Sequence, residues 1–134
     1  MFSIIVAFPH IEEAKYLKKV LNQNGYDDIL ACNSASQVIS AANELDFGIV
    51  ICGYRLTDMH YSELFGYLPR EFQMLLVASP QKLSGCINQE IICLGMPLHS
   101  HELLNTLEMM CYEYNKELRR QKKASPKQRT PKLI

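Results

Sequence analysis

Runs of apolar residues alternate with amphipathic stretches along most of the chain. Five runs are short and rich in β-branched residues, which is typical of buried strands: FSIIVAF (2–8), DDILAC (27–32), FGIVIC (47–52), FQMLLVA (72–78) and EIICLG (90–95). Helices are predicted between and after these strands, over residues 11–25, 34–45, 61–68 and 100–123, with a loop and one helical turn at 79–88. Gly25 is a stop signal for the first helix, and Ser34 or Ser36 is the expected N-cap of the second.

Five rounds of strand and helix predict βαβ units and a parallel sheet. The strands are almost continuously apolar, as expected when helices cover both faces. We therefore predict an α/β fold: a doubly wound, five-stranded parallel sheet with helices on both faces and an extended C-terminal helix. The functional crevice of such a sheet lies at the carboxyl ends of the strands. The residues there are 8–10, 53–55, 79–80 and 96–97.

The composition is that of a soluble globular chain, with 48% apolar and 21% charged residues in 134. The apolar runs are far shorter than the roughly 20 residues that a membrane helix needs. Met1 leads directly into a predicted strand without a signal-peptide pattern. We expect a cytoplasmic protein that has no contact with a membrane.

A net charge of zero conceals an uneven distribution. Residues 1–115 contain six Lys/Arg and thirteen Asp/Glu, a net charge of −7. Residues 116–134 contain eight basic residues and one acidic residue, a net charge of +7. The acidic body and the basic tail are therefore expected to have separate roles.

The five cysteines are odd in number, widely spaced and without a C-x-x-C pair: Cys32, Cys52, Cys86, Cys93 and Cys111. Several lie in apolar strand-like runs, where a thiol behaves as a small hydrophobe. Reduced structural thiols are the favoured interpretation, with a metal site or a catalytic thiol as alternatives.

Residues 1 to about 116 resemble the receiver domain of bacterial response regulators. LTDM (56–59) is similar to the L-P-D-M that follows the third strand of that family, with Thr57 in place of proline. Met96-Pro97 ends the fifth strand where the family has Lys-Pro, and HELL (101–104) then opens the last helix. The resemblance implies a flavodoxin-like (βα)5 receiver fold.

The chemistry of that family is phosphoryl transfer to an aspartate that ends the third strand. Two acidic residues after the first strand help to hold Mg²⁺, a lysine after the fifth strand neutralises phosphoryl charge, and a Ser/Thr after the fourth strand binds the phosphoryl group. Carried over by position, the acidic pair becomes Phe8 and Pro9, the phosphoacceptor Gly53 and the lysine Met96, while Ser79 keeps its type. The switch aromatic falls at or near Cys93.

Without a nucleophile or metal ligands, the chain resembles a pseudo-receiver with no cofactor, no metal and no catalytic residues. We expect Phe8, Pro9 and Met96 to form an inert apolar plug beside Gly53. A small-molecule pocket built from Phe8, Gly53, Ser79 and Met96 is an alternative.

Other polar residues near this crevice have structural interpretations. Asp58 is expected to cap a helix or to be solvated, and Glu12 and Glu13 to favour the dipole of the first helix. His99 and His101 are expected near the start of the last helix. An enzyme built on Cys52 or Cys93 with a histidine such as His10 or His60 is a further alternative.

The last predicted helix has two apolar stripes. Leu103, Leu107, Met110 and Tyr114 form one, and Leu104, Cys111 and Leu118 form the other. One stripe must cover the sheet, and the other can face a partner or widen the core-facing surface. Because receivers often dimerise through their fourth helix, fifth strand and fifth helix, the resemblance implies a homodimer or a regulatory protein partner. The residues of this possible face are Cys93, Leu103, Leu104, Leu107, Met110, Cys111, Tyr114 and Leu118.

Residues 117–134 are predicted to be a basic helical extension followed by a linker or tail. The basic residues of this end of the chain are Lys116, Arg119, Arg120, Lys122, Lys123, Lys127, Arg129 and Lys132. A pseudo-receiver followed by such a segment resembles the N-terminal half of ANTAR-type transcription antitermination regulators. That resemblance implies RNA binding only through a C-terminal module that is absent from this chain. The alternative function is a stand-alone adaptor that binds a protein through the last helix and uses the basic tail for targeting.

Overall fold

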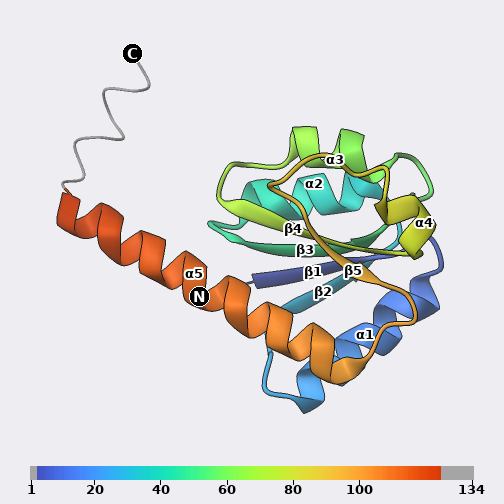
Figure 1. The fold of residues 1–134 in the computed structure, drawn as a ribbon, viewed down its shortest axis with the longest axis horizontal. Helices are drawn as coiled ribbons and strands as arrows, with labels where there is room; N and C mark the ends of the chain where they lie inside the picture. The colour runs from blue at the N-terminus through green and yellow to red at the C-terminus, as the bar shows by residue number, and fades with distance from the viewer. Residues whose placement is uncertain (1–2, 125–134) are drawn as a thin grey trace. The chain divides into compact units, whose positions relative to one another are not determined.

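The computed structural model describes the backbone of residues 3–124, and the side chains of residues 3–113, 115 and 116. Its five strands form one parallel sheet with the order β2-β1-β3-β4-β5 (Figure 1). The strands are β1 (Ser3–Ala7), β2 (Ile29–Cys32), β3 (Gly48–Gly53), β4 (Phe72–Ala78) and β5 (Ile92–Gly95). The predicted five-stranded parallel α/β fold is confirmed.

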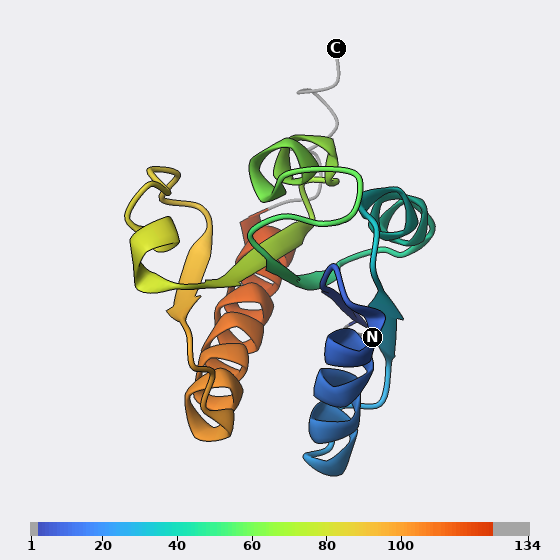
Figure 2. The same cartoon turned by 90° about the vertical axis from the view of Figure 1, so that its right-hand side faces the viewer.

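Helices pack on both faces of this sheet. In the part of the chain before residue 100 they are α1 (Ile11–Gln23), α2 (Ala35–Glu44), α3 (Tyr61–Tyr67) and the single turn α4 (Pro80–Leu83). Figures 1 and 2 show α2 and α3 on one face and α1 on the other. Because both faces are covered, every residue of β1 and β3 is buried whichever way it points, and so is all of β4 except Gln73, which explains the continuous apolar runs of these central strands.

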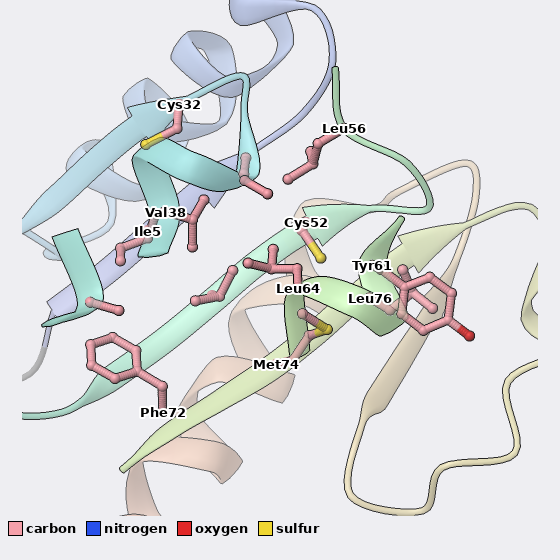
Figure 3. Packing of buried hydrophobic residues seen from close by; sticks show 14 of the residues in the cluster. Ile5, Cys32, Val38, Cys52, Leu56, Tyr61, Leu64, Phe72, Met74 and Leu76 are labelled. Atoms are coloured by element: carbon pink, nitrogen blue, oxygen red, sulfur yellow. The ribbon is translucent and has the colours of Figure 1, made fainter. Parts of the chain in front are cut away.

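The core on the α2/α3 face gathers alternate residues of the central strands. Val50 and Cys52 of β3, with Met74 and Leu76 of β4, pack there against helix residues that include Leu64 (Figure 3). The intervening strand residues are buried on the opposite face, where α1 contributes Ala14, Leu17 and Leu21. The period of two along each strand therefore fills two cores at once.

The helix boundaries follow from local capping. Ser34, not Ser36, is the N-cap of α2: its Oγ accepts from the Gln37 N–H, and the Gln37 side chain accepts in return from the Ser34 N–H, which makes a capping box. Helix α1 ends at Gln23, two residues earlier than predicted. Gly25 has a φ of 94°, which a glycine adopts without a steric penalty.

Strand β5 begins two residues later than predicted because a turn precedes it. The Asn88 Oδ1 accepts from the Glu90 N–H at 2.9 Å, and the Asn88 carbonyl accepts from the Ile91 N–H at 3.2 Å. This side-chain turn holds the backbone away from β4 until Ile92. The predicted single helical turn before it is present as α4.

The chain divides into two compact units between His99 and Ser100. The second unit contains α5 (Ser100–Ala124), the extended C-terminal helix that the sequence predicted. Within the described residues, no helix is both long and apolar enough to span a bilayer.

Candidate functional site

The candidate site lies at the carboxyl ends of the parallel strands. Phe8 and Pro9 follow β1, and Gly53 is the last residue of β3. Ser79 follows β4, and Met96 follows β5, where its N–H donates to the Ala78 carbonyl at 2.9 Å. The Met96–Pro97 peptide bond is cis.

Phe8 and Pro9 lie against Gly53. A Cβ added to Gly53 would be 3.1 Å from Phe8 Cδ1, 3.5 Å from Phe8 Cε1 and 3.7 Å from Pro9 Cδ. Gly53 itself is buried, whereas Phe8 is half-buried and Pro9 is exposed. The phenyl ring therefore occupies the direction in which any side chain at position 53 would leave the strand.

The other two predicted pocket residues are less close to this point. None of the three atoms nearest to the added Cβ belongs to Ser79 or Met96. Ser79 is the N-cap residue of α4 and makes no side-chain capping bond. The Met96 side chain is 49% exposed. The structure thus places Phe8, Pro9 and Gly53 in one contact, with Ser79 and Met96 on neighbouring strand ends.

The described residues offer no ready metal centre at this edge or elsewhere. No group of three or more His, Cys, Asp or Glu side chains among them is arranged to hold a metal ion. Glu12 and Glu13 lie in the first turn of α1, as predicted, and both are exposed. Their carboxylates are placed to interact favourably with the helix dipole.

Asp58 caps a helix, but the helix is α2, which lies more than twenty positions earlier in the chain. Its Oδ1 accepts from the Ala35 N–H at 2.6 Å and its Oδ2 from the Ser36 N–H at 3.1 Å. The hydrogen bond from Ala35 is the main cause that lowers the pKa of Asp58. Asp58 therefore ties the loop after β3 to the start of α2.

The rest of the LTDM segment strengthens this tie. The N–H and the Oγ1 of Thr57 both donate to the Asn33 carbonyl, at 3.3 and 3.1 Å. Leu56 is buried, and its N–H donates to the Met59 carbonyl at 2.8 Å. The segment holds two loops together without any contribution from Gly53.

The four histidines are placed near helix starts. His60 is the N-cap of α3, where its Nδ1 accepts from the Ser62 N–H at 3.3 Å and lies 2.8 Å from the Ser62 Oγ. His10 is the N-cap residue of α1 and makes no side-chain capping bond. His99 directly precedes α5 and His101 is its second residue, so both lie in the predicted cap region.

An aromatic cluster borders the carboxyl edge of β3. The Tyr54 ring lies 4.5 Å from His60, edge to face, and 5.4 Å from Tyr61. Lys82 of α4 places its Nζ 5.0 Å from the Tyr54 ring centroid, within the range of a cation–π contact. Sequence reasoning missed this cluster, because nothing in residue spacing shows that α4 returns to Tyr54.

Two cysteines adjoin the cluster on the side of β5. A hydrogen bond with Cys86, followed by burial, raises the pKa of Tyr61 to about 12. Burial, followed by the effect of Cys86, raises the pKa of Cys93 to about 11. Burial alone raises the pKa of Cys52 to about 12, so Cys52 is a poor nucleophile at neutral pH.

In α5, one stripe of the predicted partner face is buried and the other is partly accessible. Leu103, Leu107 and Met110 are buried, and Leu104 and Cys111 are half-buried. The side chains of Tyr114 and Leu118 lie outside the described residues. Two large apolar side chains that the sequence analysis left out, Met109 and Tyr112, are 50% and 64% exposed.

The basic residues are described only in part. Lys116 is exposed. Arg119, Arg120, Lys122 and Lys123 belong to α5, but their side chains lie outside the described part of the structure. Lys127, Arg129 and Lys132 lie wholly outside the described residues.

The fold matches those of solved receiver domains. A response regulator receiver protein from Sinorhizobium medicae superposes with a TM-score of 0.67 at 12% identity, over 84% of this chain and 96% of that chain. The Vibrio cholerae chemotaxis protein CheY4 superposes with a TM-score of 0.64 at 18% identity, over 81% of this chain and 98% of that chain. A response regulator receiver domain protein from Bacillus halodurans has a TM-score of 0.61 at 17% identity, over 81% of this chain and 95% of that chain. At these identities the likeness shows the fold alone.

Comparisons by sequence give no relative: no family model matches the chain, and no curated protein does.

Proposed function

We propose that residues 1–116 are a pseudo-receiver, a regulatory and dimerisation domain that works without aspartate phosphorylation and without enzymatic activity. The observation that carries the proposal is the contact of Phe8 and Pro9 with Gly53 at the end of β3. In the receiver pattern these positions are an acidic pair and the phosphoacceptor. A phenyl ring, a pyrrolidine and a glycine supply neither a nucleophile nor a ligand for Mg²⁺.

The larger protein that we propose is a signal-responsive transcription antitermination regulator of the cytoplasm. Support comes from the resemblance to the N-terminal half of ANTAR-type regulators and from the net charge of +7 over residues 116–134. RNA would be bound by a helical module that follows Ile134, with residues 117–134 as the extension and linker. An intact mass from the source cells tests this: a chain that extends well beyond Ile134 supports it.

The phosphorylation-independent part has a direct test. The protein is incubated with Mg²⁺ and acetyl phosphate, or with Mg²⁺ and beryllofluoride, and its mass and thermal unfolding are measured. We expect no phosphoryl adduct and no Mg²⁺-dependent shift. Gly53→Asp is the informative variant, since an aspartate at position 53 would still lack the acidic pair at Phe8 and Pro9. A stoichiometric phospho-aspartate in the unmodified protein would refute the proposal.

The homodimer is tested on α5. Leu104 and Cys111 lie seven positions apart and thus on one side of the helix, whereas Tyr112 is about 100° further round. We expect Leu104→Glu combined with Cys111→Glu to reduce dimerisation in light scattering, and the control Tyr112→Glu to leave it unchanged. An unmodified protein that is monomeric at all concentrations would contradict the dimer.

The adaptor is the second candidate, and the exposure of Met109 and Tyr112 favours it. A chain shortened at Asn115 separates the two functions. A regulatory domain should keep its fold and its dimer, whereas an adaptor that relies on α5 and the basic tail should lose its protein partner. A natural chain that ends at Ile134 would also favour the adaptor.

A further inference from the structure

Cys86 and Cys93 flank the loop that connects α4 to β5. Cys86 lies three residues after α4, where its N–H donates to the Leu83 carbonyl at 2.9 Å. Cys93 is the second residue of β5. Six residues separate the two, and Ile87 among them is 92% exposed.

Both thiols lie on the same face of the sheet. Cys93 is paired with Leu76 in the parallel register, and neighbouring residues in such a register point to the same face. Leu76 belongs to the core cluster on the α2/α3 face, and Cys86 packs against that same cluster. The register and the packing thus place both side chains on the α2/α3 face, one at each end of the loop.

Tyr61 interacts with both cysteines. Tyr61 belongs to the core cluster against which Cys86 packs, and Cys86 and Cys93 both raise the pKa of its hydroxyl. Figure 3 shows the Tyr61 hydroxyl at the outer end of the core cluster, directed away from the other labelled side chains. The Cys93 side chain, for its part, donates a long hydrogen bond to the Ile91 carbonyl at 3.9 Å.

The pair differs from the other cysteines in accessibility. Cys93 is exposed and Cys86 is half-buried, whereas Cys32 and Cys52 are buried in the core. Cys111 is half-buried and belongs to α5. A small oxidant in solution can therefore reach Cys93 first and Cys86 next.

We propose that Cys86 and Cys93 are a dithiol pair that a low-molecular-weight disulfide oxidises to an intramolecular disulfide, which makes the loop between α4 and β5 a redox-sensitive input to the domain. The role as an input rests on the proposed regulatory function, whereas the chemistry of the pair does not.

The reaction is thiol–disulfide exchange in two steps. The Cys93 thiol loses its proton and attacks one sulfur of the external disulfide, which releases one thiol and leaves a mixed disulfide on Cys93. Cys86 then attacks the Cys93 sulfur and releases the second thiol. The two cysteines together lose two protons and two electrons, and the external disulfide receives both.

Oxidation changes the contacts around the loop. The Cys86 sulfur no longer carries the hydrogen that it can share with Tyr61, and the loop between the cysteines is closed covalently. A closed loop has fewer open states, so the backbone N–H groups of residues 87–91 should exchange more slowly with deuterium. Little Cys93 thiolate is present at neutral pH, so the exchange is expected to be slow on the scale of typical thiol reactions.

The test uses the full chain in buffers with increasing ratios of oxidised to reduced glutathione. After free thiols are alkylated, a protease that cuts after glutamate cleaves at Glu90, between the two cysteines, and at Glu102 and Glu108, between Cys93 and Cys111. We expect a cross-linked pair of peptides, one containing Cys86 and the other Cys93, lighter by two hydrogen atoms than their sum. Cys86→Ser and Cys93→Ser should abolish it and leave a glutathione adduct on the remaining cysteine, and Cys111→Ser should not affect it.

Two results would overturn the proposal. The first is the accumulation of glutathione adducts on Cys86 and Cys93 with no cross-link, or a cross-link that forms only in urea. The second is a cross-link that changes neither the deuterium exchange of residues 87–91 nor the oligomeric state, which would remove the role as an input. Neither result depends on acetyl phosphate, so failure here is distinguishable from failure of the phosphorylation-independent function.

Discussion

Gly53→Asp should destabilise the protein far more than Gly53→Ala, although the resemblance to receivers implies an aspartate at this position. The alanine is the matched control for the added Cβ. That atom would be 3.1 Å from Phe8 Cδ1, so the ring must move by a few tenths of an ångström. The free-energy cost of this movement is partly offset because alanine lowers the entropy of the unfolded chain, which is worth about 0.4–1 kcal/mol. We expect Gly53→Ala to change the free energy of unfolding by no more than about 1 kcal/mol in either direction.

The aspartate adds a carboxylate to the same space. The atoms nearest to the Cβ that carries it belong to the Phe8 ring and to Pro9 Cδ, and neither group can donate a hydrogen bond or carry positive charge. Burying a polar group without a partner costs about 1–3 kcal/mol, and an ion costs more. Because Pro9 at the edge is exposed, water can reach part of the group. We therefore expect Gly53→Asp to be less stable than Gly53→Ala by about 2–4 kcal/mol at pH 7.

The penalty should depend on pH in a direction that identifies its cause. Burial raises the pKa of such an aspartate in the folded state above its unfolded value of about 3.9. Protonation then favours folding, so the difference between the two variants should be smallest below the unfolded pKa, where only the cost of burying a neutral carboxyl remains. It should grow as the pH rises toward the folded pKa, and be constant above that.

Urea unfolding followed by far-UV circular dichroism measures these differences, since the chain contains no tryptophan. Phe8→Ala introduced into both variants is the second control: it opens the space to water and should reduce the difference between them. The reasoning is refuted if Gly53→Asp and Gly53→Ala are equally stable at pH 7. That result would mean that the strand end is open to solvent and that Phe8 does not fill it.

Two further predictions concern the caps of α2. Asp58→Ala should lower the free energy of unfolding by about 0.5–1.5 kcal/mol at pH 7, with the low end favoured because the carboxylate is largely exposed. Because the folded-state pKa of Asp58 is lowered, this stabilisation is present above the unfolded pKa of about 3.9 and is lost as the pH falls through the folded pKa. If the unmodified protein stays more stable than Asp58→Ala at still lower pH, Asp58 does not stabilise α2 through its carboxylate. Ser34→Ala should lower the free energy of unfolding by about 1 kcal/mol, because it removes half of the capping box. Ser36→Ala keeps the backbone N–H that donates to Asp58, so it should cost less. Thermal unfolding of the two variants measures this, and equal losses of stability would be inconsistent with Ser34 as the cap.

The sequence was sufficient for the sheet because each strand has an apolar signal of its own. The run FQMLLVA, for example, became β4 without a shift at either end. Boundaries were missed where a turn competed with the strand, as at Asn88 before β5. Sequence preferences for helix caps also indicated Ser34 or Ser36 as the N-cap of α2. The two hydrogen bonds between Ser34 and Gln37 in the structure identify Ser34.

Contacts between distant segments were not predictable in this way. Asp58 was expected to cap a helix or to be solvated, and its sequence position gives no indication that its partners are the N–H groups of Ala35 and Ser36. The approach of Lys82 to Tyr54 likewise depends on how β4 returns beside β3. Such contacts are products of the packed sheet, so residue spacing along the chain contains no signal for them.

The LTDM segment (56–59) has a structural role of its own in this chain. Thr57 and Asp58 bond to the Asn33 carbonyl and to the first N–H groups of α2, and Leu56 is buried. None of these interactions involves Gly53. Gly53 lies against Phe8 and Pro9, whereas the loop bonds to Asn33 and to the start of α2. The hydrogen bonds of the loop therefore do not depend on which residue stands at position 53. The motif is evidence for the path of the chain, and the chemistry has to be judged from Phe8, Pro9 and Gly53.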